Sequence, residues 1–494
     1  MIGAIAGDVI GSVHEGAGTK TKDFPLFAED CRFTDDTVLT VAVAEQILRA
    51  GEFTDLFHDY FLCMGRRRGG GFKNEMDRAP WLRPGRQPLY SDGSTATMSL
   101  FGLDLTTYFY IILMFVLVDA LKVYLEIWNR PVRRSFTSDL SKVTALIPTH
   151  NGRSVIRETV EDLIRAGLLR TQILVVDDGS TDDTHQILEK LGVRFYRIPN
   201  MGKVSAINFG IHRVQTPYVL LLDDDTRIGD ARIPTSLLDH FDAAAFNVVP
   251  DRRNRYGPRG SGLVSCLQRY EYCKSMEIGR RFQDGTASIS CVSGAIGLFK
   301  KDRLQEFHHK HTGVFQGEDL QRTIIELLNE GNVVFVDETV WTVVPDRFGA
   351  LARQRILYWY PAHYHLFYSY LKLLFGRQSA WRLRYEMLYN VFVVVTDPFR
   401  FWSLVMLFYL RQWDEMGLIY ALYFLLEVYP FVIIQKKVNS GYRYLVLALY
   451  PIFGLGNAAL RTLSWFVWAY KRFVTGEMRR KTEKDRKWSG TPAA

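Results

Sequence analysis

The chain has 494 residues, of which 48% are hydrophobic, 14% are aromatic and 23% are charged. This length allows two or three domains that each bury a core, and the charged fraction excludes a protein that is embedded wholly in a membrane. With 61 Lys and Arg against 53 Asp and Glu, the formal net charge is +8. The composition therefore predicts a soluble part joined to a lipid-facing part.

Residues 1–102 are polar and glycine-rich, and two of their strings resemble a hydrolase family. MIGAIAGDVIGSVHEG and FTDDTVLTVAVAEQIL are similar to the start of the ADP-ribosylglycohydrolases. The resemblance implies that Thr34, Asp35 and Asp36 would bind magnesium. That family also needs a distant D-x-D-[ST] string, and the one such string here, Asp223 to Thr226, belongs to another part of the chain. A dinuclear site without half of its ligands binds metal weakly, so we expect a truncated relic or a gene-fusion product.

Residues 103–129 are predicted to form a transmembrane or interfacial helix. Leu105 to Trp128 is almost wholly apolar, and a run of about 20 such residues is long enough to cross a bilayer. Asp119 and Lys122 lie within this run, and charges are costly in lipid, so we expect both to face protein or the interface. Basic residues follow at once and mark a cytoplasmic side: Arg130, Arg133 and Arg134.

Residues 140–350 alternate between short β-rich runs and segments with helical spacing. VTALIP, QILVVDD, VRFYRIP and YVLLLDDD read as strands, and SVIRETVEDLIRAG, DTHQILEKLG and KVSAINFGIHRV read as helices. This alternation predicts a Rossmann-like α/β fold whose mostly parallel sheet is covered by helices. Ligands bind such sheets at the carboxyl ends of the strands, where the aspartates of this region lie.

Three acidic groups lie in this α/β region: Asp177-Asp178, Asp223-Asp224-Asp225 and Glu318-Asp319. Aspartates at strand ends can hold a divalent cation, and a further carboxylate beside a hydroxyl can act as a general base. Each group alone also has a plain structural reading, such as a solvated strand end or the N-cap of a helix. Their order and context favour the chemical reading.

In this order the motifs resemble the family-2 glycosyltransferases, in particular the cellulose, chitin, hyaluronan and poly-N-acetylglucosamine synthases. IPTHN, DDGS, NMGKVSAIN, LLLDDDT, SGAIGLFKK and GED match the family's motifs from Thr144 onward, and the family has a glycosyltransferase A-type fold. The resemblance implies Asp319 as the catalytic base and Asp223 and Asp225 as ligands of Mg²⁺ or Mn²⁺ and the donor diphosphate. It also implies donor contacts from Asp177, Asp178 and Lys203, and an acceptor contact from Glu318.

The last motif departs from the family pattern. Processive members carry Q-x-x-R-W, whereas this chain has ARQRILYWY. Gln354 and Arg355 are expected to reach the donor diphosphate, because guanidinium binds phosphate well. Tyr358 or Trp359 is expected to contact the acceptor sugar. The departure weakens the case for processive synthesis without changing the case for sugar transfer.

The remaining residues are apolar and aromatic up to a basic end. We expect interfacial helices at 351–376, transmembrane helices at 388–470 and a basic cytoplasmic tail at 471–494. Gly441 to Trp468 is interrupted by Pro451, Gly454 and Gly456. Lys436 and Lys437 favour a cytoplasmic turn before this stretch, so both of its ends are cytoplasmic only if it is a hairpin or a re-entrant element. Because the tail follows a hydrophobic segment, anionic lipid is a better partner for it than nucleic acid.

The sequence thus predicts an inverting glycosyltransferase in the inner membrane, with several spans and a cytoplasmic catalytic domain. The resemblance implies transfer of a hexose or N-acetylhexosamine from a UDP-sugar to a polysaccharide or glycolipid acceptor. One alternative is a membrane-tethered ADP-ribosylglycohydrolase with an inactive transferase domain, and another is a non-catalytic sensor of nucleotide sugars. A partner subunit is compatible with all three.

Overall fold

The computed structural model describes residues 105–128, 132–251, 262–308, 310–311, 317–377, 379–438 and 442–475, which belong to one compact unit. Residues 1–102, with Thr34, Asp35 and Asp36, lie outside the described residues. The resemblance of that segment to a hydrolase is therefore not tested by the structure.

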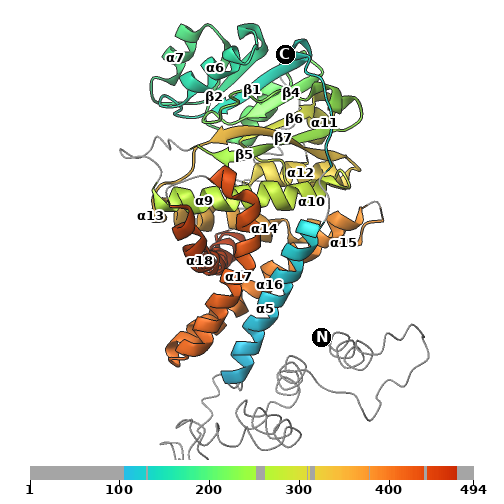
Figure 1. Ribbon diagram of the computed structural model, residues 1–494. Helices are drawn as coiled ribbons and strands as arrows, with labels where there is room; N and C mark the ends of the chain where they lie inside the picture. The colour runs from blue at the N-terminus through green and yellow to red at the C-terminus, as the bar shows by residue number, and fades with distance from the viewer. Residues whose placement is uncertain are drawn as a thin grey trace, which may run out of the picture. The chain divides into compact units, whose positions relative to one another are not determined.

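A seven-stranded sheet forms the centre of the soluble part (Figure 1). The strands are β1 (Val143–Thr149), β2 (Ile173–Asp178), β3 (Arg194–Ile198), β4 (Tyr218–Leu222), β5 (Ala243–Pro250), β6 (Ile296–Lys300) and β7 (Val333–Thr342). Their order is β3-β2-β1-β4-β6-β5-β7, and β6 runs antiparallel to both of its neighbours while every other pair is parallel. This arrangement confirms the predicted mostly parallel α/β sheet.

Helices connect these strands because the intervening segments carry apolar residues at helical spacing. In α6 (Ile156–Arg165), for example, Ile156, Val160 and Leu163 are all buried on one face. The other helices are α7 (Thr184–Leu191), α8 (Lys203–Ile211), α9 (Leu263–Lys274), α10 (Arg281–Asp284), α11 (Lys301–His308) and α12 (Glu318–Leu328). Short 3₁₀ helices are η1 (Leu140–Lys142), η2 (Arg170–Gln172) and η3 (Thr235–Asp239), and the π-helical segment η4 (Ser275–Arg280) joins α9 to α10.

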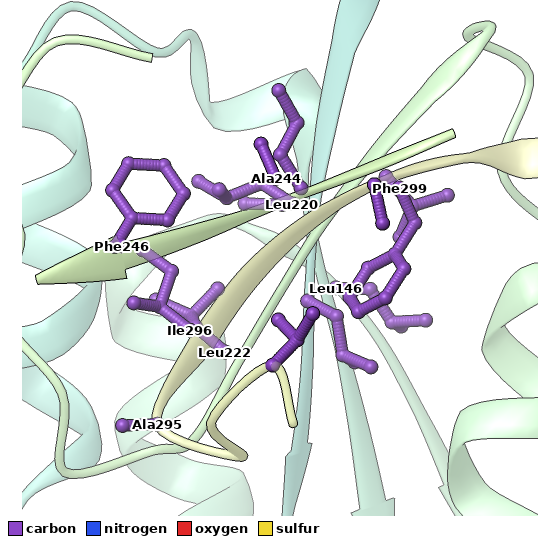
Figure 2. Close-up of a cluster of buried hydrophobic side chains, with 14 of the residues drawn as sticks. Leu146, Leu220, Leu222, Ala244, Phe246, Ala295, Ile296 and Phe299 are labelled. Carbon is purple, nitrogen blue, oxygen red and sulfur yellow. The ribbon is translucent and has the colours of Figure 1, made fainter. Parts of the chain in front are cut away.

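The main hydrophobic core lies on the central strands of this sheet. Figure 2 shows Leu146 of β1, Leu220 of β4, Phe246 of β5 and Phe299 of β6 gathered from four neighbouring strands. All seven residues of β1 are buried, as expected for a parallel strand that is covered on both faces. At about 2 kcal/mol for each large buried apolar side chain, this core holds the strand ends in fixed positions.

Two groups of helices follow the sheet. The first group is short: α13 (Phe348–Gln354), the π-helical turn η5 (Arg355–Trp359), α14 (Tyr360–His365) and α15 (Phe367–Phe375). The second group is long: α16 (Trp381–Tyr409), α17 (Trp413–Val438) and α18 (Arg443–Ala469), which continues into the π-helical turn η6 (Tyr470–Val474). Together with α5 (Leu105–Trp128), which precedes the sheet, the long helices give four that are long and apolar enough to cross a membrane, by length and composition.

The charges in the first long helix face protein, as the sequence predicts. Asp119 of α5 lies 3.1 Å from the guanidinium of Arg400 in α16. Lys122 lies 2.9 Å from the carboxylate of Glu386, also in α16. Ionisable groups in apolar helices are tolerated when they pair with one another, and these pairs join α5 to α16.

The last apolar stretch, for which the sequence left a hairpin or re-entrant element open, forms a single helix. α18 is one continuous helix from Arg443 to Ala469, with Pro451 inside it. A proline removes one hydrogen bond to the carbonyl four residues earlier, but neighbouring helices can compensate for that loss in apolar surroundings. Here α18 packs along α16 and α17, and tertiary packing outweighs the local helix-breaking tendency.

Candidate active site

The carboxyl ends of the central strands open into a cavity of about 500 Å³. Asp223 and Asp225 follow β4, Ser293 to Ala295 precede β6, and Asp319 lies in the first turn of α12. The cavity is lined by these residues and by Met201, Gly202, Lys203, Val204, Ser205, Tyr272, Glu318, Thr342, Val343, Gln354, Leu357, Tyr358, Trp359 and Lys471. Most of the residues singled out in the sequence therefore share one cavity.

Asp319 is held by backbone amides at the wall of this cavity. Its Oδ2 accepts a hydrogen bond of 2.8 Å from the N–H of Gly294, and its Oδ1 accepts one of 2.8 Å from its neighbour Leu320. Burial raises the pKa of Asp319 above its usual range, and the nearby Glu318 carboxylate raises it further. A raised pKa makes a carboxylate a stronger base, which suits the abstraction of a proton from a hydroxyl.

Lys203 links two of the other carboxylates. Its Nζ lies 2.6 Å from Asp223 and 2.5 Å from Glu318. Burial opposes the charge on Lys203, but the two carboxylates hold its pKa above the usual range. Burial also raises the pKa of Asp223 to about 6, whereas for Glu318 the charges of Lys203 and Arg322 outweigh burial and lower the pKa to about 2. Lys203 is shared between Glu318 and the partly exposed Asp223, so Asp223 can accept a further cation.

Asp225 lines the same cavity, and with Asp223 it offers two carboxylates to a divalent cation. Burial raises its pKa to about 7, with Asp223 and Asp224 contributing, and its Oδ1 accepts only a long hydrogen bond of 3.4 Å from Thr342. Among the residues that the structure describes, no group of three or more His, Cys, Asp or Glu side chains could hold a metal by itself. Two carboxylates at a strand end do fit Mg²⁺ or Mn²⁺ when a diphosphate supplies further oxygens.

Asp177 and Asp178 shape the neighbouring loops. Asp178 accepts hydrogen bonds from the backbone N–H groups of Met201, at 2.7 Å, and Gly202, at 2.8 Å. The fully buried Asp177 accepts one of 2.8 Å from the N–H of Ser180. Asp178 also lines a second cavity of about 440 Å³. Four residues line both cavities: Gly202, Lys203, Asp223 and Asp225. Asp177 is not among the lining residues of either cavity.

The segment at the end of the soluble part closes one side of the first cavity. Gln354, Tyr358 and Trp359 line it, as the sequence predicts, but Arg355 does not. The guanidinium of Arg355 is buried and lies 2.5 Å from the carboxylate of Glu271 in α9, and it stacks on Trp359 at 4.2 Å from the ring centre. In this structure Arg355 is thus a partner of α9 and not a lining residue.

Three further lining residues, Gly294, Tyr272 and Lys471, were not named as site residues from the sequence. A Cβ at Gly294 would lie 3.4 Å from Asp319 and 3.6 Å from Asp223, in ordinary contact with both. Tyr272 comes from α9, and Lys471 comes from η6 near the end of the described chain. Only Gly294 had a sequence signal, since it lies in the string SGAIGLFKK that matches a family motif; nothing local marks the other two.

Comparisons with known proteins agree with the motifs. Residues 144–304 match the family model described as Glycosyl transferase family 2. The chain is 25% identical over 248 residues to the poly-beta-1,6-N-acetyl-D-glucosamine synthase of Staphylococcus epidermidis, covering 47% of this chain and 58% of that protein. It is also 25% identical over 228 residues to the synthase of the same name from Staphylococcus aureus, covering 44% of this chain and 54% of that one. The chain thus spans little more than half the length of these relatives.

Solved structures with low similarity are also matched. A mannosyltransferase from Pyrobaculum calidifontis, in complex with GDP-Man and Mn²⁺, has a TM-score of 0.42 and 14% identity and covers 78% of this chain and 98% of that one. The S. aureus protein TarS in complex with UDP-GlcNAc has a TM-score of 0.35 and 16% identity and covers 67% of this chain and 92% of that one.

The segment that matches the family model includes β1 to β6, the Asp223–Asp225 strand end and the loop at Gly294. Its sheet has the mixed, mostly parallel order described above, in keeping with the predicted glycosyltransferase A-type fold. Residues 144–304 thus resemble a glycosyl transferase family 2 domain, and the other residues that line the cavity lie beyond this match.

Proposed function

We propose that the protein is a membrane-bound inverting glycosyltransferase that moves a hexose or N-acetylhexosamine from a UDP-sugar to a polysaccharide or glycolipid acceptor. The observation that carries this proposal is one cavity lined by Asp319 and by Asp223 and Asp225, of which the last two lie in the segment that matches the family-2 model. The N-acetylhexosamine class rests on the similarity to poly-beta-1,6-N-acetyl-D-glucosamine synthases.

Asp319 has the position and the chemistry of the base. Its two oxygens are fixed by the N–H groups of Gly294 and Leu320, and its burial raises its pKa. An acceptor hydroxyl in the cavity loses its proton to Asp319 while its oxygen attacks the anomeric carbon of the donor from the face opposite the nucleotide. A single displacement of this kind inverts the configuration at that carbon.

The other wall of the cavity receives the leaving group. Asp223 and Asp225 would hold Mg²⁺ or Mn²⁺, which would neutralise the negative charge that develops on the departing diphosphate. Lys203, at 2.6 Å from Asp223, is placed to share that charge. Gln354 lines the same cavity, where its side-chain amide N–H groups can donate to the departing diphosphate.

The acceptor side is aromatic. Tyr358 and Trp359 line the cavity beside Tyr272, and the rings of Tyr272 and Trp359 lie 6.2 Å apart. Flat rings pack well against the apolar faces of sugars. The long apolar helices support a membrane location, with the catalytic domain on the cytoplasmic side where nucleotide sugars occur. Membrane lipids, a saccharide or lipid-linked acceptor, and a further subunit are the partners of this proposal.

The decisive experiment measures UDP release from UDP-GlcNAc and other UDP-sugars by the detergent-purified full chain with Mg²⁺ or Mn²⁺. We expect turnover of one donor, loss of at least about 100-fold in Asp319→Asn, and no loss in Asp302→Asn. Asp302 is an exposed aspartate of α11, so this variant matches the chemical change away from the cavity. Unchanged turnover in Asp319→Asn contradicts the proposal. Release of ADP-ribose from a modified protein, without turnover of any donor, would transfer the function to residues 1–102.

A further inference from the structure

The long apolar helix α18 contacts the soluble part near both of its ends. Near its start, Val446 and Leu447 pack with Tyr270 and Cys273 of α9. The ring of Tyr450 lies 4.4 Å from that of Tyr270, in an edge-to-face contact.

The middle of α18 contacts α14 and α16, and its end reaches the cavity; Arg461 also pairs with Asp397 of α16. The backbone carbonyl of Arg461 accepts a hydrogen bond of 2.6 Å from the hydroxyl of Tyr364 in α14. Lys471, in the η6 turn that continues α18, lines the cavity that also holds Asp223 and Asp319. The helix therefore contacts α9 near its start and the cavity at its end, while its middle packs on α14, α16 and α17.

This geometry does not fit a helix that crosses a bilayer. At about 1.5 Å per residue, the distance from Val446 to Lys471 is about 37 Å, which exceeds the ~30 Å thickness of a hydrocarbon core. A crossing helix that leaves the soluble part at Val446 would carry Lys471 to the opposite side of the membrane. Lys471 instead shares a cavity with the strand ends of the sheet.

The three other long helices behave differently, because each contacts the soluble part near one end. Ile127, near the end of α5, packs in the cluster formed with α9. Arg382, near the start of α16, donates a hydrogen bond of 2.6 Å to the carbonyl of Phe282. Lys437, at the end of α17, lies 3.4 Å from Asp337 of β7.

The opposite ends of these three helices pack against one another. Their buried apolar contacts form a separate cluster that includes Ile112 of α5, Leu407 of α16 and Ile419 of α17, and Leu455 from the middle of α18 also packs against it. In Figure 1, α5 and α17 extend away from the sheet, whereas α18 is seen nearly end-on below α9. The helices α5, α16 and α17 thus have the arrangement of spans, and α18 runs across them.

One face of α18 is apolar and exposed. Leu445, Ile452, Leu463 and Phe466 are between 45% and 60% exposed, and their spacing of 7, 11 and 3 residues places them on one side of an α-helix. The buried side carries polar residues, among them Asn457 and Ser464. A helix with an exposed apolar stripe along one side fits a membrane surface, where that stripe enters the lipid and the other side stays on protein.

We propose that α18 lies in the plane of the cytoplasmic membrane surface, with its exposed apolar face in the lipid, and that only α5, α16 and α17 cross the bilayer. Positive charges at both ends agree with a cytoplasmic position for each: Lys436, Lys437 and Arg443 before or at the start, and Lys471 and Arg472 after the end. The interface of an anionic bilayer is the partner that this face fits. The continuous helix also removes the need for a hairpin that the sequence alone imposed.

The test is the sidedness of three single cysteines in the full chain, with the five native cysteines replaced, in sealed membrane vesicles of known orientation. The positions are Tyr442→Cys before α18, Thr475→Cys after it, and Asp414→Cys at the turn between α16 and α17. We expect an impermeant maleimide to label positions 442 and 475 from the same side and position 414 from the other. Labelling of 442 and 475 from opposite sides overturns the proposal.

A second measurement does not depend on the loops or on catalysis. Nitroxide labels at Ile452→Cys and Leu463→Cys, both on the exposed face, report their depth in the bilayer through accessibility to oxygen and to a water-soluble relaxant. An in-plane helix gives equal depths. A helix along the membrane normal separates the two labels by about 16 Å, at 1.5 Å for each of the 11 intervening steps, and a difference of that size contradicts the inference.

Discussion

Arg355 can either bind the donor diphosphate or stabilise the fold. Substitution of its partner Glu271 distinguishes these two roles. The sequence resemblance places Arg355 on the donor diphosphate, whereas the structure places its guanidinium at 2.5 Å and 3.1 Å from the two carboxylate oxygens of Glu271. Only 3% of the Arg355 side chain is exposed, compared with 24% for Glu271. Burial opposes the positive charge, but Glu271 holds the pKa of Arg355 above its usual range.

The change Glu271→Gln keeps the shape of the side chain and leaves a buried guanidinium without its countercharge. Breaking a buried ion pair from one side costs about 3–5 kcal/mol. The contact of the Arg355 guanidinium with the Trp359 ring remains in this variant. We therefore expect the free energy of unfolding to fall by the lower end of that range, about 3 kcal/mol. At roughly 2–4 °C per kcal/mol, the midpoint of thermal unfolding falls by about 6–12 °C.

The assay is thermal unfolding of the purified chain in detergent, together with the KM for the UDP-sugar. Glu271→Gln and Arg355→Gln should both lower the midpoint, and their double variant should lose less than the sum because the two residues interact directly. Glu306→Gln, an exposed change on α11, is the matched control and should leave the midpoint unchanged. A tenfold rise in KM for Arg355→Gln, with an unchanged midpoint and an unaffected Glu271→Gln, would refute the structural role and restore the donor contact.

Three further changes test the cavity. Because Asp319 must be ionised to act as a base and its pKa is raised, kcat should fall as the pH drops through a value above the ordinary aspartate range, which a pH–rate profile measures. Chelation by EDTA should abolish turnover and Mg²⁺ or Mn²⁺ should restore it, with Asp223→Asn needing at least about tenfold more metal in a metal titration. Gly294→Ala places a methyl group 3.4 Å from Asp319 and should reduce kcat/KM by about 10–100-fold, which steady-state kinetics measures. The contact is not a clash, so the midpoint of thermal unfolding should stay unchanged.

Residues at strand ends were predictable because strand position is a local property of the sequence. An apolar run followed by aspartates gives both the strand and the edge at which the aspartates emerge, so Asp223 and Asp225 could be assigned to one cavity. The same reasoning brought Asp178 to the correct edge. It could not show that the carboxylate of Asp178 accepts hydrogen bonds from Met201 and Gly202, because that role depends on the path of a loop more than 20 residues later in the chain.

Contacts between distant elements were not predictable from the sequence. Arg355 lies in a string that resembles a donor-binding motif. Its guanidinium nevertheless donates a hydrogen bond to Glu271, which lies some 80 residues earlier in the chain. The continuity of α18 through Pro451 was not predictable either, because packing against α16 and α17 decides the helix and no pattern within the stretch reveals those neighbours. Local motifs thus identify the chemistry of the site, while tertiary packing determines which residues reach it.

The wall of the cavity opposite the sheet depends on that packing. Gln354, Tyr358 and Trp359 lie at the junction of α13 and η5, and η5 packs on α18, whose continuation η6 supplies Lys471. A π-helical turn needs support because its hydrogen-bond geometry is less favourable than that of an α-helix, and such turns occur often at functional sites. The two turns that close the cavity are thus held by the helix that we place on the membrane surface. The position of α18 therefore bears on catalysis as well as on topology, since a shift of this helix would move Lys471 and the aromatic wall together.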